Sequence, residues 1–361
     1  MVVFFSILTA LVGGTYLFMQ QAVFGKEPTG QRLARIEASP NYKDGAFQNQ
    51  LHTPMSPPDV SYWQMAKHLI LKPKDVKPPK SLPFVKTDLK TLVAPKPTIV
   101  WFGHSSYLIK SQDFVLLMDP VFSGQASPVS FFGKAFAGAD EYKAEDMPDI
   151  DVIVLSHDHY DHLDYETILK LAPKTKHFYT ALGVGENLEH WGVPAEKITE
   201  LDWWQQQKIS LDIEIIATPA RHFSGRKFAR GKSLWASYVL KLHGYSLFLG
   251  GDSGMAPHFA EIGAKYGPFD IAFLENGQYA PEWPYIHSMP EETALIAKQL
   301  NTKVLMPVHW AKFELSYHPW NEPIKRLVQA AKVQNLELTT PLIGQPVVID
   351  SLYPKQVWWE F

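Results

Sequence analysis

The stretch Val152-Ile-Val-Leu-Ser-His-Asp-His-Tyr-Asp-His162 joins a short apolar run to a cluster of possible metal ligands. The run is made of Val, Ile and Leu and has the length and composition of a buried strand. Three histidines and an aspartate follow it in the pattern His-x-His-x-Asp-His. A single loop histidine would be unremarkable, but this spacing at the end of a strand indicates a metal-binding loop.

The expected geometry of this loop suits two metal ions. We expect the strand to end at Leu155 and a helix to begin after Asp164, which is a typical N-cap residue. A turn between them can direct the first two ligands to one side and the last two to the other. Because the chain has no Cys, any metal site must use His, Asp or Glu, and imidazole and carboxylate ligands suit zinc. The four ligands in the loop are His157, His159, Asp161 and His162.

Three more candidate ligands follow other predicted strands. They are His222 after Ile213–Ala217, Asp252 after Tyr245–Leu249, and His309 after Val304–Val308. In an open α/β sheet, the carboxyl ends of the strands meet at one rim, where sites are built. We therefore expect these residues to join the loop ligands in one centre.

The chain from Thr98 onward alternates apolar runs of strand length with helical stretches. The other predicted strands are Thr98–Phe102, Ser106–Ile109, Phe114–Met118, Leu234–Leu242, Phe269–Leu274 and Val347–Ile349. Helices are expected after Asp164, at Pro290–Leu300 and at Ile324–Val333. Hairpins followed by strand–helix alternation predict an α/β fold with sheets packed together and helices outside.

Composition narrows the class of function. The formal net charge is -3 at pH 7, and a nucleic-acid-binding protein usually has a basic excess, so we expect no nucleic-acid partner. The absence of Cys excludes disulfides and thiolate ligands but does not decide the compartment. Oligomeric state is not readable from the sequence.

Residues 1–24 contain no charged side chain and begin with a strongly apolar run. A signal peptide usually has a basic residue before a shorter apolar core, and none is present here. We therefore interpret residues 1–24 as an uncleaved membrane anchor, with a cleaved signal as the alternative. Lys26, Arg32 and Arg35 follow, which favours a catalytic domain on the cytoplasmic side; a periplasmic or exported protein is the alternative.

Residues 25–97 are polar and rich in Pro, as in Thr53-Pro-Met-Ser-Pro-Pro58. This density of Pro favours extended chain packed on the surface of another domain. Residues 98–361 are then the catalytic domain.

The motifs together resemble the metallo-β-lactamase fold superfamily, and within it the phospholipases D that hydrolyse N-acylphosphatidylethanolamine. The resemblance extends from about Trp101 to Trp320. It rests on Trp101–Leu108, Met118–Ser123 with Ala126-Ser-Pro128, Ser156–Tyr165, Glu200–Trp204, Ala272–Trp283 and Val308–Trp310. Two features depart from the family pattern: the N-terminal anchor, and Phe223 where Trp is expected.

The resemblance implies a four-layer αββα sandwich with an N-terminal hydrophobic helix, and two Zn²⁺ ions, although other divalent metals would also fit. Asp252 would bridge the two ions. The first ion would be held by His157, His159 and His222, and the second by Asp161, His162 and His309.

The same resemblance implies that a metal-bridging hydroxide attacks a phospholipid phosphorus and releases phosphatidic acid and an N-acylethanolamine. Asp161 and Asp252 are the expected catalytic carboxylates, and His104 and Asp119 are candidates for orienting the ligands. The leaving-group acid could be His287 or His318. Arg221, in a basic loop beside His222, could attract the phosphate, and Tyr279 could line an apolar mouth.

Alternatives remain open, because a fold does not fix a function. The chain could be a lactonase or a different phosphodiesterase of the same fold. A nuclease is disfavoured by the net charge, and a protein that uses metal only for stability is disfavoured because structural zinc sites usually hold a single ion.

Overall fold

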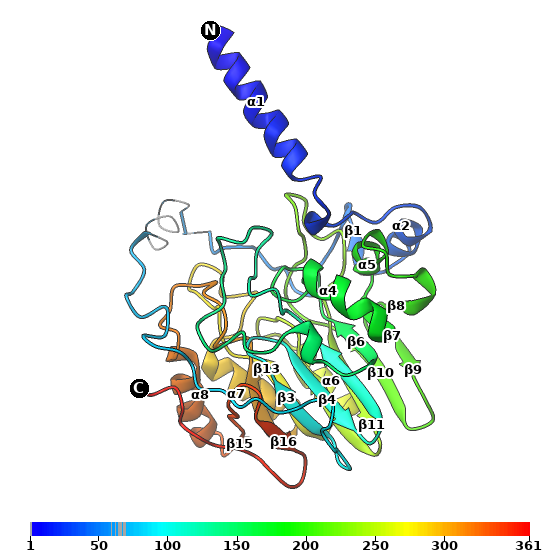
Figure 1. The fold of residues 1–361 in the computed structure, drawn as a ribbon, viewed down its shortest axis with the longest axis vertical. Coiled ribbons are helices and arrows are strands. Elements are labelled where there is room, and N and C mark those ends of the chain that lie inside the picture. The colour runs from blue at the N-terminus through cyan, green and yellow to red at the C-terminus, as the bar shows by residue number, and fades with distance from the viewer. Residues whose placement is uncertain (1, 59, 62, 64–66, 68–69) are drawn as a thin grey trace.

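The computed structural model describes residues 2–58, 60–61, 63, 67 and 70–361. Within them, two seven-stranded sheets form the centre of the fold (Figure 1). The first sheet contains, in spatial order, β16 (Pro346–Val348), β3 (Thr98–Trp101), β4 (Tyr107–Ser111), β5 (Phe114–Met118), β6 (Ile150–Leu155), β7 (Thr175–Ala181) and β8 (Ile198–Leu201). The second contains β15 (Glu337–Leu338), β14 (Thr302–Val308), β13 (Phe269–Glu275), β12 (Tyr245–Leu249), β11 (Ser237–Leu242), β10 (Ile213–Thr218) and β9 (Gln206–Lys208).

Each sheet is half antiparallel and half parallel. Strands β5 to β8 pair in parallel in the first sheet, and β12 to β15 do so in the second. Parallel neighbours require crossover connections, and helices supply several of them. The helices of the domain are α4 (Tyr165–Leu171), α5 (Gly185–His190), α6 (His258–Tyr266), α7 (Pro290–Gln299) and α8 (Glu322–Val333).

The two sheets pack face to face between helical layers. Tyr107 of β4 stacks on Phe273 of β13 with ring centroids 4.3 Å apart, and one buried apolar cluster includes residues of both sheets. Helix α5 contacts β8 of the first sheet, while α7 contacts β13 and β14 of the second. The predicted four-layer αββα arrangement is confirmed.

Most predicted strands lie within a residue or two of the observed ones, because continuous apolar runs of this length become buried central strands. The predicted strand Leu234–Leu242 has the wrong first residue, because β11 begins at Ser237. The amide of Leu234 donates to Leu182 O and that of Ala236 to Ser156 O, so this segment pairs with loops instead of joining the ladder. Strands β7, β8, β9 and β15 and helices α5 and α6 were not predicted.

The N-terminal helix α1 covers Val2–Phe18 and extends away from the rest of the fold (Figure 1). No helix among the described residues is both long and apolar enough to cross a membrane, so the expected spanning anchor is not supported. The chain after α1 forms a short 3-10 turn, Ala22–Phe24, that packs on the domain. Trp191 Nε1 donates to Ala22 O at 2.7 Å, and Phe24 is buried.

Residues 25–97 contain some regular structure that their Pro content did not predict. Helix α2 covers Gly30–Glu37, and a small hairpin joins β1 (Tyr42–Lys43) to β2 (Ala46–Phe47). Arg32 of α2 pairs with Glu186 and Glu200 of the domain at 2.7 and 2.9 Å. The segment therefore packs on the domain through helix, hairpin and extended chain alike.

Candidate metal centre

The loop after β6 turns as the sequence predicts. The amides of His162 and Leu163 both donate to His159 O, at 3.1 and 2.8 Å, which closes a tight turn between the first and last ligands. Asp164 caps α4, since its side chain accepts from Glu166 N. The turn separates the loop's ligands into two groups.

The first group contains only imidazoles. His159 Nδ1 lies 2.9 Å from His157 Nε2 and 3.2 Å from His222 Nε2. His222 Nδ1 lies 2.8 Å from Ile286 O, so this nitrogen donates to the carbonyl and Nε2 faces the group. One atom from each of the three side chains falls within 4.8 Å of the others, which suits a single metal ion.

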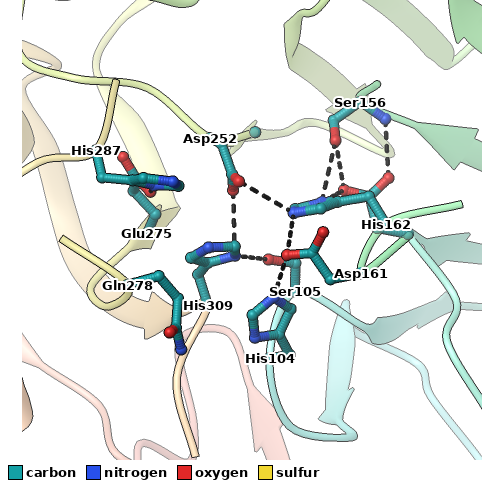
Figure 2. Close-up of polar contacts among 12 residues, drawn as sticks. His104, Ser105, Ser156, Asp161, His162, Asp252, Glu275, Gln278, His287 and His309 are labelled. Carbon is teal, nitrogen blue, oxygen red and sulfur yellow. Dashed lines mark hydrogen bonds and ion pairs between the residues drawn. The ribbon is translucent and has the colours of Figure 1, made fainter. Parts of the chain in front are cut away.

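The second group mixes imidazole and carboxylate. His162 Nε2 lies 3.5 Å from Asp161 Oδ2, and His309 closes the group from the end of β14. His104 joins them, with Nε2 2.9 Å from Asp161 Oδ2 (Figure 2). His104 lies where it could orient Asp161, and it is also close enough to the other side chains to bind metal itself, so its predicted orienting role stays a prediction.

Asp252 lies close to ligands of both groups, and Figure 2 shows its carboxylate facing His162 and His309. Its Oδ2 is 3.2 Å from His162 Nε2 and 3.7 Å from His222 Nε2, while its Oδ1 is 3.1 Å from His309 Nδ1. One carboxylate thus contacts ligands of both groups. This is the placement that a bridging ligand requires.

Buried polar groups hold the ligands from behind. Asp119 Oδ2 lies 2.7 Å from His162 Nδ1 and accepts from Ser156 Oγ at 2.6 Å. Ser105 Oγ lies 3.0 Å from His309 Nδ1. Partners of this kind fix the orientation of His162 and His309, which metal ligands generally require.

The electrostatics of the centre favour neutral imidazoles with one exception. Burial lowers the pKa of His157, His222 and His309 well below the ordinary value. Burial also works against a charge on His162, but the surrounding carboxylates, with Asp252 first, outweigh it and raise its pKa. Neutral imidazole is the form that binds metal, and clustered carboxylates call for a nearby positive charge.

The residues fit bound metal on independent grounds. Among the described residues, His162 Nε2 and Asp252 Oδ1 are buried without a hydrogen bond, although each lies within ion-pair distance of another member of the centre, Asp252 Oδ2 at 3.2 Å and His309 Nδ1 at 3.1 Å. Buried polar atoms of this kind are costly unless something pairs with them. A cation held by the His and Asp donors would satisfy both atoms, so the seven predicted ligands form a plausible metal centre.

His287 and Glu275 form a hydrogen-bonded pair beside the centre, and Glu275 was not predicted. His287 Nδ1 donates to Glu275 Oε2 at 2.6 Å, and Glu275 Oε1 accepts from the amides of Ser253 and Ser288. Burial opposes a charge on His287, but the Glu275 carboxylate raises the pKa of His287 to about 8. Glu275 is the last residue of β13, so the strand-end rule that found Asp252 could also have found it.

A cleft of about 900 Å³ opens over the metal ligands. His159, Asp161, His222, Asp252, His287 and His309 face it, together with Gln278 and Arg230. Its apolar lining includes Phe223, Phe228, Trp283, Ile286 and Leu315. The centre is therefore open to a ligand with both polar and apolar parts.

Other predicted substrate residues lie elsewhere. Tyr279 and His318 line a separate hollow of about 630 Å³. Both ring nitrogens of His318 are engaged, Nε2 by Gln278 N and Nδ1 by Pro319 O. Arg221 is held by Thr53 Oγ1, His52 O and Met255 O, and its guanidinium lies over the Tyr285 ring.

Strained backbone marks the centre as well. His104, Asp119 and His309 have positive φ angles of 52°, 40° and 64°, which is unusual for residues with a side chain. The amide of His309 donates to His104 O and that of His104 to Trp310 O, both at 2.9 Å, which holds two of these turns together. Strain of this kind persists where the surroundings impose it, often at functional sites.

The comparisons with known proteins agree with this geometry. Residues 115–310 match the beta-lactamase superfamily domain. An uncharacterised protein of Mycobacterium tuberculosis is 36% identical over 97% of this chain and 96% of its own length. The N-acyl-phosphatidylethanolamine-hydrolyzing phospholipase D 1 of Caenorhabditis elegans is 30% identical over 64% of this chain and 69% of its own length. A metallo hydrolase from Ignicoccus hospitalis superposes with a TM-score of 0.54 at 18% identity, over 70% of this chain and 97% of its own.

The fold, the ligand set and the family match define a metal-dependent hydrolase of the metallo-β-lactamase superfamily. Within it, the chain belongs to the branch that contains the phospholipases D hydrolysing N-acylphosphatidylethanolamine.

Proposed function

We propose that this chain is a phospholipase D-type phosphodiesterase that hydrolyses N-acylphosphatidylethanolamine to phosphatidic acid and an N-acylethanolamine. The observation that carries the proposal is the cleft. Its floor is a His and Asp centre, about half of its lining residues are apolar, and it carries Arg230. Such a cleft suits a substrate with an anionic phosphate and long hydrocarbon chains, and the C. elegans relative is named for this reaction.

The proposal includes two zinc ions. His157, His159 and His222 would hold one, while Asp161, His162 and His309 would hold the other, and Asp252 would contact both. Two zinc ions bound there would supply a nucleophile from water at neutral pH and would stabilise the attacking and leaving oxygens.

The chain's own residues orient the substrate and move the proton. Arg230 lines the cleft with its guanidinium over the Phe223 ring, at a ring-centroid distance of 4.8 Å, and could contact the phosphate. His287 lines the cleft, and because its Nδ1 donates to Glu275, its Nε2 is left for the leaving oxygen. Water adds to phosphorus, the bond from phosphorus to the ethanolamine oxygen breaks, and that oxygen takes a proton.

The test is turnover of the lipid in water labelled with ¹⁸O. Full-length protein reconstituted with zinc is incubated with N-acylphosphatidylethanolamine in mixed micelles, and the products are analysed by mass spectrometry. We expect phosphatidic acid that carries one ¹⁸O, unlabelled N-acylethanolamine, and no product with an Asp252→Asn variant. Label in the N-acylethanolamine would indicate attack at carbon and would contradict the proposal.

The alternative activities of this fold give a different outcome. A lactonase would hydrolyse acyl lactones and form no phosphatidic acid from the lipid. A different phosphodiesterase would hydrolyse a water-soluble phosphodiester and leave the lipid intact. Either result with metal-loaded protein would replace the proposed substrate and would keep the metal centre.

A further inference from the structure

A segment from the N-terminal region lines part of the metal cleft. Residues 49–58, which we call the strap, follow β2 directly. Phe47 of β2 is buried, and its amide donates to Gly231 O at 2.8 Å, which fixes the start of the strap against the loop that carries His222. The strap lies outside residues 115–310, which match the family domain.

Asn49 binds the backbone of a metal ligand. Its Nδ2 donates to His222 O at 2.8 Å, and its Oδ1 accepts from His222 N at 3.1 Å. Trp235 Nε1, which is buried, also donates to Asn49 Oδ1 at 3.0 Å. The amide of Asn49 thus satisfies both backbone groups of His222, as a neighbouring strand would, and restricts the backbone from which the imidazole projects.

A second attachment follows a few residues later. Arg221 Nε donates to Thr53 Oγ1 at 2.9 Å, and the same guanidinium reaches His52 O at 3.3 Å and Met255 O at 3.3 Å. Arg221 precedes His222, so both attachments of the strap are to one short stretch of the metal loop. In this structure the Arg221 side chain holds the strap, while its predicted contact with the substrate stays a prediction.

Beyond these attachments the strap faces the cleft. Met55, Ser56, Pro57 and Pro58 line it on one side, while Phe223, Phe228 and Trp283 also line it. The prolines fix their φ angles, so this side of the cleft loses little conformational entropy when a ligand binds. A preorganised apolar surface suits hydrocarbon better than a charged group.

We propose that the strap contributes to the metal centre in two ways. Asn49 positions His222 by binding its backbone. Met55 and the neighbouring Pro57 and Pro58 form an apolar side of the cleft, which we call the wall, that contacts the apolar part of the substrate. The role of the wall depends on the lipid substrate proposed above, whereas the positioning role of Asn49 does not depend on it. Asn49 is a positioning residue, because it acts through His222.

The positioning role is tested by zinc affinity, which needs no substrate. Full-length Asn49→Leu is compared with Asn41→Leu as a matched control. Asn41 lies in the same N-terminal region as Asn49, and its side chain donates to Asp202 Oδ1 in the domain. We expect Asn49→Leu to weaken zinc binding about tenfold or more, as loss of an orienting partner commonly does. Asn41→Leu should bind zinc like wild type, measured in competition with a chelating dye.

A second variant distinguishes a loss of positioning from a loss of folding. Asn49→Asp keeps an acceptor for His222 N and loses the donor to His222 O, so its zinc affinity should fall between wild type and Asn49→Leu. Thermal unfolding in the presence of chelator shows whether each chain folds. Wild-type zinc affinity in both Asn49 variants, or an equal loss in Asn41→Leu, would overturn the positioning role.

The wall is tested by the preference for chain length. For wild type, kcat/KM is measured on a long-chain N-acylphosphatidylethanolamine and on its short-chain, water-soluble homologue. In Met55→Ser the long-to-short ratio should fall about tenfold, the size that a lost aliphatic contact can produce. Leu211→Ser is the control, since Leu211 is fully exposed in the turn between β9 and β10.

The possible failures are distinguishable. An unchanged ratio in Met55→Ser, with a wild-type enzyme that prefers the long chain, would overturn the wall alone. A wild-type enzyme that hydrolyses neither lipid but binds zinc would overturn the proposed function and with it the wall. The zinc affinities of the Asn49 variants would still decide the positioning role.

Discussion

Asp119 Oδ2 lies 2.7 Å from His162 Nδ1, and both side chains are fully buried. Ser156 donates to the same carboxylate twice, from its amide at 2.8 Å and from its hydroxyl at 2.6 Å. Asp119 therefore accepts both hydrogen bonds from Ser156 and lies against His162 Nδ1, which leaves His162 Nε2 facing Asp252. This pair connects the first sheet to the metal ligands.

Replacing Asp119 by Asn should therefore weaken the centre. An amide places an NH₂ group where a donor now lies, so it cannot accept all of the present hydrogen bonds. We expect Asp119→Asn to reduce zinc affinity by about 10- to 100-fold, measured against Asp151→Asn. Asp151 accepts from Val115 N at 2.8 Å near the start of β6, and its loss should leave zinc binding unchanged. Unaltered zinc affinity in Asp119→Asn would contradict the orienting role.

The division of ligands into two groups predicts a metal count. Reconstituted wild-type protein should contain about two ions per chain, and His222→Ala and His309→Ala should each retain about one. Plasma mass spectrometry after dialysis measures the content. Fewer than one ion per chain in wild type would refute the two-metal centre, and loss of both ions in each variant would show that the groups are not independent.

The two candidate acids predict different losses of activity. His287 faces the cleft with one nitrogen free of Glu275, whereas both nitrogens of His318 are engaged by backbone groups. We expect His287→Gln to lower kcat about a hundredfold or more, with the metal content retained. His318→Gln should cost much less. The reverse order, or wild-type kcat in His287→Gln, would exclude His287 as the acid.

Lys312 predicts a pH dependence of stability. It is buried, with Nζ donating to Val121 O at 2.8 Å, and burial lowers its pKa from 10.5 to about 8. Between about pH 8 and 10.5 the unfolded chain therefore binds more protons than the folded one, so this residue adds stability as pH rises through that window.

Lys312→Met removes this contribution. Wild type and Lys312→Met are unfolded with urea, both in chelator. The free energy of unfolding of wild type, relative to that of Lys312→Met, should increase as pH rises from about 8 to 10.5. Tyrosines and other lysines titrate in both proteins and cancel in the difference. Parallel pH profiles would show that Lys312 keeps an ordinary pKa in the folded protein.

The metal loop shows how far local sequence information reaches. Its strand, its tight turn and the Asp164 cap are all set within about a dozen residues, so the alternation of apolar run and ligands predicted them. His222, Asp252 and His309 were found by a rule that is nearly local, since each follows an apolar strand whose end must lie at the rim of a sheet. Glu275 obeys the same rule and was missed only because a single acid at a strand's end is a weak signal.

The sequence by itself predicted the cluster of His and Asp residues, the packed sheets with outer helices and most strand positions, because periodicity and strand-end placement depend on neighbours along the chain. The sequence offered His104 and Asp119 as candidates for orienting the ligands, and only the tertiary structure showed which ligand each side chain contacts and that Asn49 joins them. Asn49 meets His222 across 173 positions, and Asp119, which follows β5, meets His162, which follows the neighbouring strand β6. Such contacts arise when distant segments fold together, and no local pattern encodes them. The structure likewise separated His287, in the cleft, from His318, which packs in another hollow.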